Sequence, residues 1–360
     1  YSSFDPPYRC KNGPLDSLEE LLLVQGVTPE MVFGNDKNRN GVIDPGEDDG
    51  SGSANLGLQA FLTVHSRELN YDQENQVRTN VNAQDLVATV SALNSTVGED
   101  LSLYIAAARL YGTTSSSSSS GTSGSTSSGG STSGTGSTSG GGSTSGASGG
   151  ASTSGDTTEA KTKIQEDLAA SASKRLKNIA SLWDLDNSSV TVTVGTGRTQ
   201  KKITYPSPLK DQTQQRDLLP KLLNYCTTNN KLELTPRVNI NTAPEAVVTS
   251  LKDVASLTDE VIQNILTKRP TLGSSSAAEE IYRTPAWLLT EAGLSISACK
   301  KMETFATTQS MVYRFQSMGS FEQGGPTARF EAVVDTNLGR PRIVFLRDIS
   351  ELGPGFAGNP

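Results

Sequence analysis

The side chains best suited to bind a ligand lie in residues 36–47, which read DKNRNGVIDPGE. A twelve-residue calcium loop needs side-chain oxygens at positions 1, 3, 5, 9 and 12 and a backbone carbonyl at position 7. The residues at these six positions are Asp36, Asn38, Asn40, Asp44, Glu47 and, for the carbonyl, Val42. Gly41 stands where such loops turn sharply, and Ile43 where they place an inward apolar side chain. The spacing predicts a bound Ca²⁺ ion. An acidic surface turn, the alternative, would not require Gly41 and Ile43 in register.

Residues for catalysis are scarce in this chain. His65 is the only histidine, and it lies in the apolar run FLTVHSREL, where a structural role is expected. Neither a P-loop nor an H-E-x-x-H zinc motif is present. The carboxylates outside residues 36–47 have the spacing of helix caps and exposed helix faces. We therefore predict that the protein is not an enzyme and that its one cofactor is structural Ca²⁺.

Two short helices are expected to position the loop. Within residues 15–34, Asp16 or Ser17 can cap a helix that carries four leucines, and Gly26 can end it. Thr28 and Pro29 have the types that begin a second helix, with proline at its favoured first position. The pattern predicts a helix–turn–helix unit that leads directly into residues 36–47.

A short internal repeat follows. Arg78–Val90 reads RTNVNAQDLVATV and Arg237–Leu251 reads RVNINTAPEAVVTSL, so each copy has Arg, then Asn-apolar-Asn, then a helix start. In the second copy Asn241 or Thr242 is the expected helix cap, with Pro244 in the first turn. We interpret the repeat as one recurring helical unit. Helices are expected over residues 83–93, 97–110, 257–268, 283–294 and 295–307.

The β signal lies in two places. Residues 190–205 (VTVTVGTGRTQKKITY) predict a hairpin that turns at 195–197. Residues 311–346 predict an antiparallel meander of three strands, because apolar residues alternate along them with period two. One face of this sheet is therefore apolar: Met311, Tyr313, Phe315, Ala328, Phe330, Ala332 and Val334. Something must cover that face, and no long amphipathic helix in this sequence obviously does, so a covering helix is expected upstream of Tyr1.

Composition excludes several function classes. A formal charge of −7 and a pI of about 5.0 argue against a nucleic-acid partner, whose phosphates attract clustered Lys and Arg. No apolar run approaches the ~20 residues of a membrane helix, and the first residues do not read as a signal peptide. Cys10, Cys226 and Cys299 allow either one disulfide with a spare thiol or three thiols.

Residues 113–155 consist almost entirely of Ser, Gly and Thr. Such a stretch has no apolar surface to bury, so it is expected to behave as a flexible insertion that is dispensable for chemistry.

Three segments in this order resemble the general secretion pathway protein K family, the large minor pseudopilins of type II secretion systems. They are NGPLDSLEELLLVQGVTPEMVFG, the segment NINTAP, and the ending MVYRFQSMGSF…ARFEAVVDT…PRIVFLRDISELG. The resemblance covers most of the chain outside residues 113–155, which are not part of the family pattern. The family's leader and long N-terminal hydrophobic helix are also absent from this sequence.

The resemblance implies an α+β fold: a pseudopilin-type antiparallel sheet with an inserted helical domain, the long N-terminal helix lying outside this fragment. The expected division has four segments. Residues 1–112 are the first part of the helical domain with the calcium loop, 113–158 a disordered insertion, 159–307 the hairpin and second helical part, and 308–360 the C-terminal strands.

The function implied by the resemblance is non-enzymatic. The chain would act at the tip of the pseudopilus in protein export, with structural calcium and with other minor pseudopilins, and potentially secreted substrate proteins, as partners. It would sit at the periplasmic face of the bacterial inner membrane, held by a single N-terminal anchor, without nucleic acid.

Two alternatives stay open. One is a calcium-dependent protein-binding module, although such modules normally carry two loops. The other is a helix-hairpin-helix DNA-uptake protein, because NINTAP followed by a helix resembles the opening of that motif. The glycine-free hairpin Lys252–Leu257 and the acidic charge argue against DNA binding.

Overall fold

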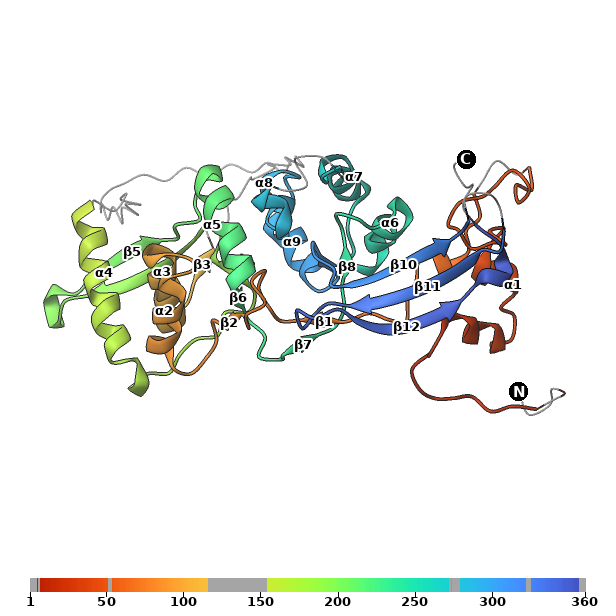
Figure 1. The fold of residues 1–360 in the computed structure, drawn as a ribbon. Helices are drawn as coiled ribbons and strands as arrows, with labels where there is room; N and C mark the ends of the chain where they lie inside the picture. The colour runs from red at the N-terminus through yellow and green to blue at the C-terminus, as the bar shows by residue number, and fades with distance from the viewer. Residues whose placement is uncertain are drawn as a thin grey trace, which may run out of the picture. The chain divides into compact units, whose positions relative to one another are not determined.

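The computed structural model describes residues 5, 7–50, 54–115, 154–271, 273, 279–321 and 325–355. The chain folds as two compact units (Figure 1). The first comprises Tyr1–Arg78, Leu223–Tyr225 and Asn230–Pro360, and the second Thr79–Leu222 and Cys226–Asn229. Each unit thus combines segments that are distant in sequence, whereas the sequence analysis divided the chain into consecutive stretches. Both units mix helices with small sheets, which confirms the α+β class.

The first unit contains a three-stranded sheet and several short helices. Its strands are β1 (Glu68–Leu69), β7 (Glu233–Leu234), β8 (Val238–Asn239), β9 (Ala306–Thr307), β10 (Val312–Gly319), β11 (Ala328–Asp335) and β12 (Arg342–Asp348). Its α-helices are α1 (Pro29–Phe33), α6 (Glu245–Val254), α7 (Asp259–Lys268), α8 (Trp287–Thr290) and α9 (Ile296–Glu303). The 3₁₀ helices are η1 (Leu18–Leu23), η2 (Leu58–Ala60), η7 (Glu280–Arg283) and η8 (Ser350–Leu352).

The second unit packs helices on a separate small sheet. Its strands are β2 (Thr79–Asn80), β3 (Thr114–Ser115), β4 (Ser188–Val194), β5 (Lys201–Pro206) and β6 (Cys226–Thr227). Its helices are α2 (Leu86–Asn94), α3 (Glu99–Tyr111), α4 (Ser154–Ala169), most of α5 (Gln212–Tyr225), and the 3₁₀ helices η3 (Ser171–Ser173), η4 (Leu182–Leu185) and η5 (Gly197–Thr199). Among the described residues of both units, no helix has the length and apolar character needed to cross a membrane.

Most of the Ser/Gly/Thr-rich stretch, residues 116–153, lies outside the described residues. Its two ends are described. Thr114 and Ser115 form β3, which pairs with β4, and α4 begins at Ser154. The regular structure of the second unit therefore extends a few residues into the segment 113–158 on either side.

The expected β elements are confirmed. The hairpin β4–β5 pairs in antiparallel register, and the inward side chains of Val190, Val192 and Ile203 are at most 2% exposed. The C-terminal meander has the order β10-β11-β12, antiparallel throughout. The helix cap at Thr28 is also confirmed, because its hydroxyl accepts a hydrogen bond from Met31 N (3.3 Å).

Two expectations about helix starts are wrong. The leucine-rich segment after Ser17 is a 3₁₀ helix, and Ser17 makes no capping hydrogen bond to its backbone. In the second repeat the cap position of α6 is Pro244, which has no side-chain acceptor. Asn241 and Thr242 lie upstream of that position, and Asn241 Nδ2 instead donates to Tyr282 O (2.7 Å) in the 3₁₀ helix η7.

The internal repeat folds into the same structure twice. In each copy a two-residue strand pairs in parallel with a second short strand, β2 with β6 and β8 with β9. The strand ends at an asparagine, Asn80 or Asn239, whose side chain accepts a hydrogen bond from the backbone N–H two residues further on. Helix α2 or α6 follows. The recurring helical unit read from the sequence is thus a strand, an Asx turn and a pair of helices.

The second asparagine of each copy ties the turn to a backbone carbonyl that is distant in sequence. Asn82 Nδ2 donates to Ile179 O (2.9 Å), as Asn241 Nδ2 does to Tyr282 O (2.7 Å). In the first copy Asn82 Oδ1 also accepts from Arg109 Nη1 (2.7 Å) and Ile179 N (2.9 Å). In the second copy the corresponding oxygen, Asn241 Oδ1, is buried with no hydrogen-bond partner among the described residues.

This difference predicts unequal effects of truncation. Asn82→Ala is expected to lower the free energy of unfolding by about 2–3 kcal/mol, because it removes three hydrogen bonds: one from the buried Arg109 guanidinium and two with the backbone of Ile179. Asn241→Ala removes a single donated bond and is expected to cost about 1 kcal/mol. Urea denaturation of the two variants measures both values. Equal losses would contradict the assignment of these bonds.

A buried acid in the second unit predicts a pH dependence. Asp186 is 4% exposed and accepts a hydrogen bond from Gln215 Nε2 (3.0 Å). Burial raises the pKa of Asp186 to about 6, against the weaker opposing effect of that bond. Because the folded-state pKa lies above the unfolded one, the neutral acid's contribution is present below about pH 4 and is lost as pH rises through about 6.

Asp186→Asn keeps the acceptor for Gln215 and cannot ionise. At pH 8 we expect its free energy of unfolding, measured by urea titration, to exceed that of wild type by about 1–3 kcal/mol. At pH 4 the two free energies should be similar. Asp217→Asn, at an exposed carboxylate of α5 paired with Lys221, is the matched control. A pH-independent difference for Asp186→Asn would contradict the prediction.

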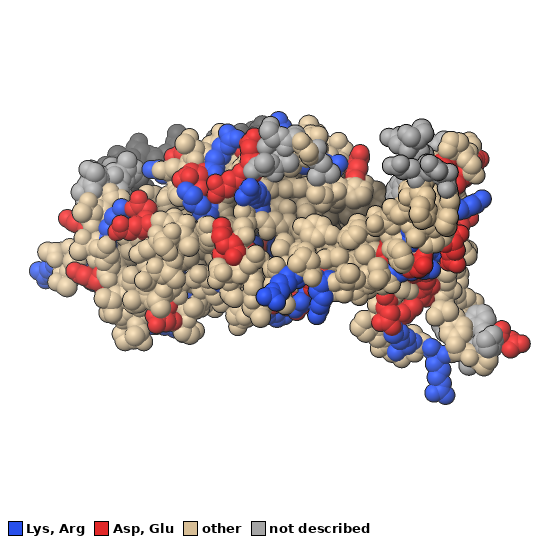
Figure 2. Space-filling model, viewed as in Figure 1, with Lys and Arg blue, Asp and Glu red and all other residues tan. Residues whose placement is uncertain are grey.

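The three-stranded sheet of the first unit has two unlike faces. Register places Tyr313 opposite Val334, Phe315 opposite Ala332 and Ala332 opposite Leu346, so these side chains share one face. That face is apolar and open: Tyr313 is 51%, Phe315 49% and Leu346 59% exposed. In Figure 2 the surface over β10–β12 is mostly neither acidic nor basic.

The other face of the sheet is polar and covered. Arg329, Glu331 and Asp335 of β11 alternate with the apolar set and are all at most 7% exposed. Arg329 donates to Asn38 O and Asp335 pairs with Arg67, both in the segment that contains the predicted calcium loop. Glu331 pairs with Arg314 of β10, which in turn donates to Gln59 O of the same segment. The sheet therefore serves as the platform on which that segment rests.

Candidate metal centre

The loop of residues 36–47 follows helix α1, and a backbone hydrogen bond closes the base of the loop region. Asn35 N donates to Asn55 O (2.7 Å), so the chain enters and leaves the loop region at one point. Gly34 and Gly57 make this approach possible, because a Cβ on Gly34 would lie 2.4 Å from Gly57 N and a Cβ on Gly57 would lie 2.6 Å from Val32 O. Both glycines also have positive φ, 65° and 64°. The base thus fixes the orientation of the loop relative to α1.

The first and last ligand positions organise the loop backbone. Asp36, 6% exposed, accepts from Asn40 N through Oδ1 (3.1 Å) and from Gly41 N through Oδ2 (2.8 Å). Glu47 accepts from Lys37 N (2.9 Å) and Asn38 N (3.0 Å) through Oε1, and from Asp44 N (3.2 Å) through Oε2. Gly41 has φ +84°, the conformation expected at the sharp turn. The two carboxylates therefore close the loop from both ends.

The middle positions converge on one carboxylate oxygen. Asn38 Nδ2 (2.7 Å) and Asn40 Nδ2 (3.1 Å) both donate to Asp44 Oδ2. The amide oxygens accept from backbone, Asn38 Oδ1 from Asn40 N (3.0 Å) and Asn40 Oδ1 from Val42 N (2.8 Å). An amide oxygen has two lone pairs, so each keeps one for a cation. Val42 itself is 59% exposed, as expected for a residue that offers only its carbonyl.

The loop carries more negative than positive charge in its interior. Its carboxylates are Asp36, Asp44 and Glu47. Arg39 turns away from them: its guanidinium lies 4.1 Å from the centre of the Phe33 ring and its Nη1 is 3.3 Å from Glu19 Oε1. Lys37 is exposed. Carboxylates held together with hydrogen-bonded amides form the all-oxygen donor set that suits a hard divalent cation.

The donor chemistry of the loop fits calcium when carboxylates and amides act together. Among the residues that the structure describes, no three His, Cys, Asp or Glu side chains form a metal-holding cluster by themselves. The structure brings Asn38, Asn40 and Asp44 into direct contact and links Asp36 and Glu47 to them through backbone. These residues would hold the ion, which would supply the positive charge that the loop lacks.

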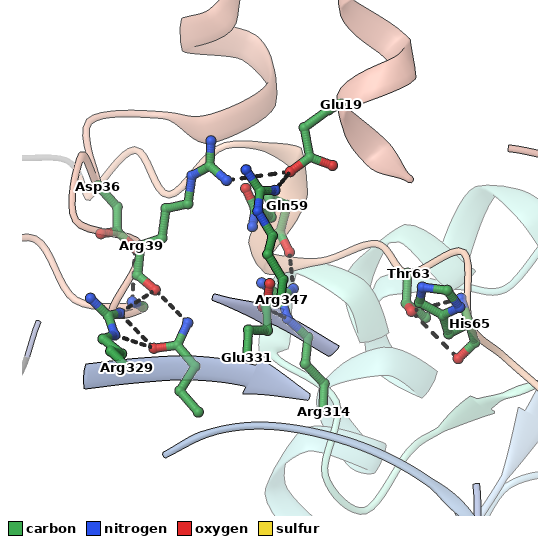
Figure 3. Close-up of polar contacts among 12 residues, drawn as sticks. Glu19, Asp36, Arg39, Gln59, Thr63, His65, Arg314, Arg329, Glu331 and Arg347 are labelled. Carbon is green, nitrogen blue, oxygen red and sulfur yellow. Dashed lines mark hydrogen bonds and ion pairs between the residues drawn. The ribbon is translucent and has the colours of Figure 1, made fainter. Parts of the chain in front are cut away.

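A buried arginine anchors the loop to the sheet (Figure 3). Arg329 of β11 is 1% exposed, and its guanidinium donates to Asn38 O (2.8 Å) and Arg39 O (3.0 Å). Gln316 of β10 orients it from below, accepting through Oε1 from Arg329 Nη2 (2.6 Å), and donates to the same Arg39 carbonyl (2.8 Å). Burial lowers the pKa of Arg329, and the charges of Asp36 and Glu331 oppose that effect.

A second set of charged groups holds η1 and η2 on the sheet (Figure 3). Glu19 Oε1 pairs with Arg347 Nη1 of β12 (2.5 Å) as well as with Arg39. Arg314 of β10 pairs with Glu331 and donates to Gln59 O (3.1 Å). Burial opposes ionisation of Glu19, but hydrogen bonds from its own backbone, Ser17 and Arg347 outweigh it and lower the pKa of Glu19. The loop's supports are therefore ionic as well as hydrogen-bonded.

Sequence reasoning missed Arg329 and Gln316 because it followed only the apolar face of the meander. A signal was present: arginine or glutamate lies in the register between the apolar residues at four positions, 314, 329, 331 and 347. Charged residues in that register predict a covered polar face rather than a solvated one.

The remaining candidate residues have structural surroundings. His65 is partly buried, with its ring 5.1 Å from that of Phe345. The three cysteines are thiols in the structure, Cys10 exposed and Cys226 and Cys299 buried. Of the two alternatives left open, the disulfide is therefore not formed.

No protein-family model, no curated protein and no solved structure matches the chain.

Proposed function

We propose that this chain is the folded part of a minor pseudopilin, a non-enzymatic subunit at the tip of a type II secretion pseudopilus. It would act at the periplasmic face of the bacterial inner membrane, through an N-terminal helix upstream of Tyr1, with other minor pseudopilins as partners. The three sequence segments that resemble the family, in the family's order, support this proposal. On the same basis we propose that the α+β fold is of the pseudopilin type.

The observation that carries the proposal is the open apolar face of the sheet β10–β12. Exposed large side chains on a monomer's surface normally lie apart, whereas here Tyr313, Phe315 and Leu346 lie on one face of adjacent strands. Ile343 and Phe330 extend the same face, at 60% and 39% exposure. A sheet with one covered polar face and one open apolar face is what a long amphipathic or hydrophobic helix would complete.

Calcium has a structural role in this proposal. Residues 36–47 lie on the covered face and are bound to β10 and β11 through Gln316 and Arg329. An ion there would keep the covering segment folded, without any sensing role. Calcium loops of extracellular modules bind with a Kd of ~10⁻⁴–10⁻³ M, so a weak site is sufficient for a structural role outside the cytoplasm.

The glycine-free hairpin between α6 and α7 supports the choice against a DNA-binding role. Ser256 takes the left-handed conformation there, with φ +51°, and Leu257 N is used in a bond to Lys252 O (2.8 Å). That N–H is therefore not available to a phosphate. A calcium-dependent binding module would not require the apolar face. Function that is retained in a variant of that face would therefore favour such a module.

The test uses the full-length gene in its bacterium, with export of secreted proteins and co-purification of the other minor pseudopilins as readouts. Leu346→Glu places a charge on the apolar face at a 59% exposed position. Val254→Glu, on α6 at 58% exposure, is the matched control. We expect Leu346→Glu to abolish export and co-purification, and Val254→Glu to retain both. Both isolated chains should melt as wild type does, because both positions are exposed.

Equal export by the two variants would contradict the proposal. So would an upstream gene sequence that encodes neither a leader nor an apolar helix of ~20 residues.

A further inference from the structure

The chain's C-terminal segment Gly353–Gly355 lies against the candidate metal loop. Asn40 Nδ2 donates to Gly355 O, and Arg329 Nη1, which also holds Asn38 O, lies 3.4 Å from Gly353 O. Gly355 has φ +71°, and a Cβ at this position would lie 2.1 Å from Arg329 Nη1. Only glycine lets the segment pass this close to the guanidinium. The contact is therefore built, and one of its two links comes from a ligand position of the loop.

Asn40 faces in two directions. Its Oδ1 belongs to the loop, where it accepts from Val42 N (2.8 Å) and keeps a lone pair for a cation. Its Nδ2 is shared between Asp44 Oδ2 (3.1 Å) and Gly355 O. A carboxylate that binds a cation becomes a poorer acceptor for an amide, so loading the loop would leave Gly355 O as the principal partner of Asn40 Nδ2.

We propose that calcium binding to residues 36–47 fixes the C-terminal segment 353–355 on the sheet, with Asn40 as the coupling residue. The proposal rests on the metal site of the proposed function. Twelve ordered loop residues with three carboxylates are costly to hold without a cation, at about 1–2 kcal/mol of backbone entropy per residue. When the loop loosens, Gly355 O loses the donor that Asn40 provides, and only the Arg329 link to the segment remains.

The coupling must be reciprocal. If calcium tightens the C-terminal segment by a given factor, a fixed segment raises calcium affinity by the same factor. One hydrogen bond gives an expected factor of about two to ten. The segment thus becomes a device that reports whether the loop is loaded, and the surface it covers depends on calcium.

The experiment measures hydrogen exchange of the peptide 349–355 with Ca²⁺ and with chelator, alongside calorimetric titration of Ca²⁺. In wild type we expect exchange to slow about two- to tenfold on loading. Asn40→Asp and Asn38→Asp are matched, because each adds one carboxylate at a position where such loops accept Asp or Asn. Only Asn40→Asp loses the amide that donates to Gly355 O. We expect both variants to bind Ca²⁺ and only Asn38→Asp to keep the slowed exchange.

Three outcomes would overturn the coupling while leaving the metal site intact. They are calcium binding by wild type without slowed exchange, wild-type slowing in an Asn40→Asp variant that binds calcium, and unchanged calcium affinity in Gly355→Ala. The last substitution displaces the segment and tests the reciprocal direction independently of Asn40. Absence of calcium binding in wild type would instead overturn the metal site itself, and the coupling with it.

Discussion

Removal of calcium is expected to lower the free energy of unfolding of the first unit by about 3 kcal/mol when the ion is initially present at a hundred times its Kd. An ion that binds only the folded state stabilises it by mass action, and the unfolded chain does not bring residues 36–47 together. The loop is also hydrogen-bonded to the polar face of the sheet by Arg329 and Gln316. Loosening of the loop would therefore expose β11 as well. Thermal melts with Ca²⁺, with chelator, and with Mg²⁺ measure the effect.

Glu47→Gln tests the same site from within the chain. The variant loses one charge and one acceptor at the position that closes the loop on Lys37, Asn38 and Asp44. Calcium should then no longer raise the melting temperature, or should do so only at much higher concentration. Glu30→Gln, at an exposed carboxylate in the first turn of α1, is the control and should keep the calcium response. A melting temperature that changes neither with chelator nor in Glu47→Gln would show that the loop is a simple surface turn.

Arg329→Met is expected to cost about 3–5 kcal/mol of unfolding free energy. Methionine fills a similar volume but leaves Asn38 O and Gln316 Oε1 without the guanidinium donor, while Arg39 O keeps only its bond from Gln316 Nε2. Each buried acceptor without a partner costs about 1–3 kcal/mol. Arg329→Lys should recover only part of the loss, since an ammonium cannot reproduce the planar fork that reaches three acceptors.

The control for Arg329→Met is Arg342→Met, at an exposed arginine of β12 in the same sheet. Denaturant titration should show little change there. The Arg329 variants should also bind calcium more weakly, because two loop carbonyls lose their anchor. Full stability in Arg329→Met would contradict the view that this side chain joins loop and sheet.

Local pattern was enough to predict the elements whose stability is local. The alternation along residues 311–346 and 190–205 predicted the strands, and Thr28 was recognised as a helix start because a threonine hydroxyl can bond the nearby backbone, as it does to Met31 N. The ligand positions 36, 38, 40, 44 and 47 were also readable, because a metal loop is a short stretch of consecutive residues. Whether the ion binds remains a prediction.

Contacts over long distances in sequence could not be predicted in the same way. Arg329 reaches Asn38, and Glu19 reaches Arg347, only because the meander returns beneath the N-terminal segment. Asn241 or Thr242 was expected to cap α6, but that helix begins after Pro244, and Asn241 Nδ2 donates to Tyr282 O of η7 instead. In these cases the tertiary partner decides what a side chain does, and no local window contains that partner.

The repeated strand–turn–helix architecture has an evolutionary consequence. The two copies keep the parallel strand pair, the asparagine turn and the arginines near the end of the second helix, since Arg109 and Arg269 donate to Ala83 O and Ala243 O respectively. They differ in what is inserted: the second unit has β3 and α4 before its 3₁₀ helix η4 and the hairpin β4–β5 after it. A duplicated ancestor that grew at these two junctions accounts for both copies. Homologous chains should therefore vary in length there, around residues 113–158 above all, while the asparagines and arginines of the turn persist.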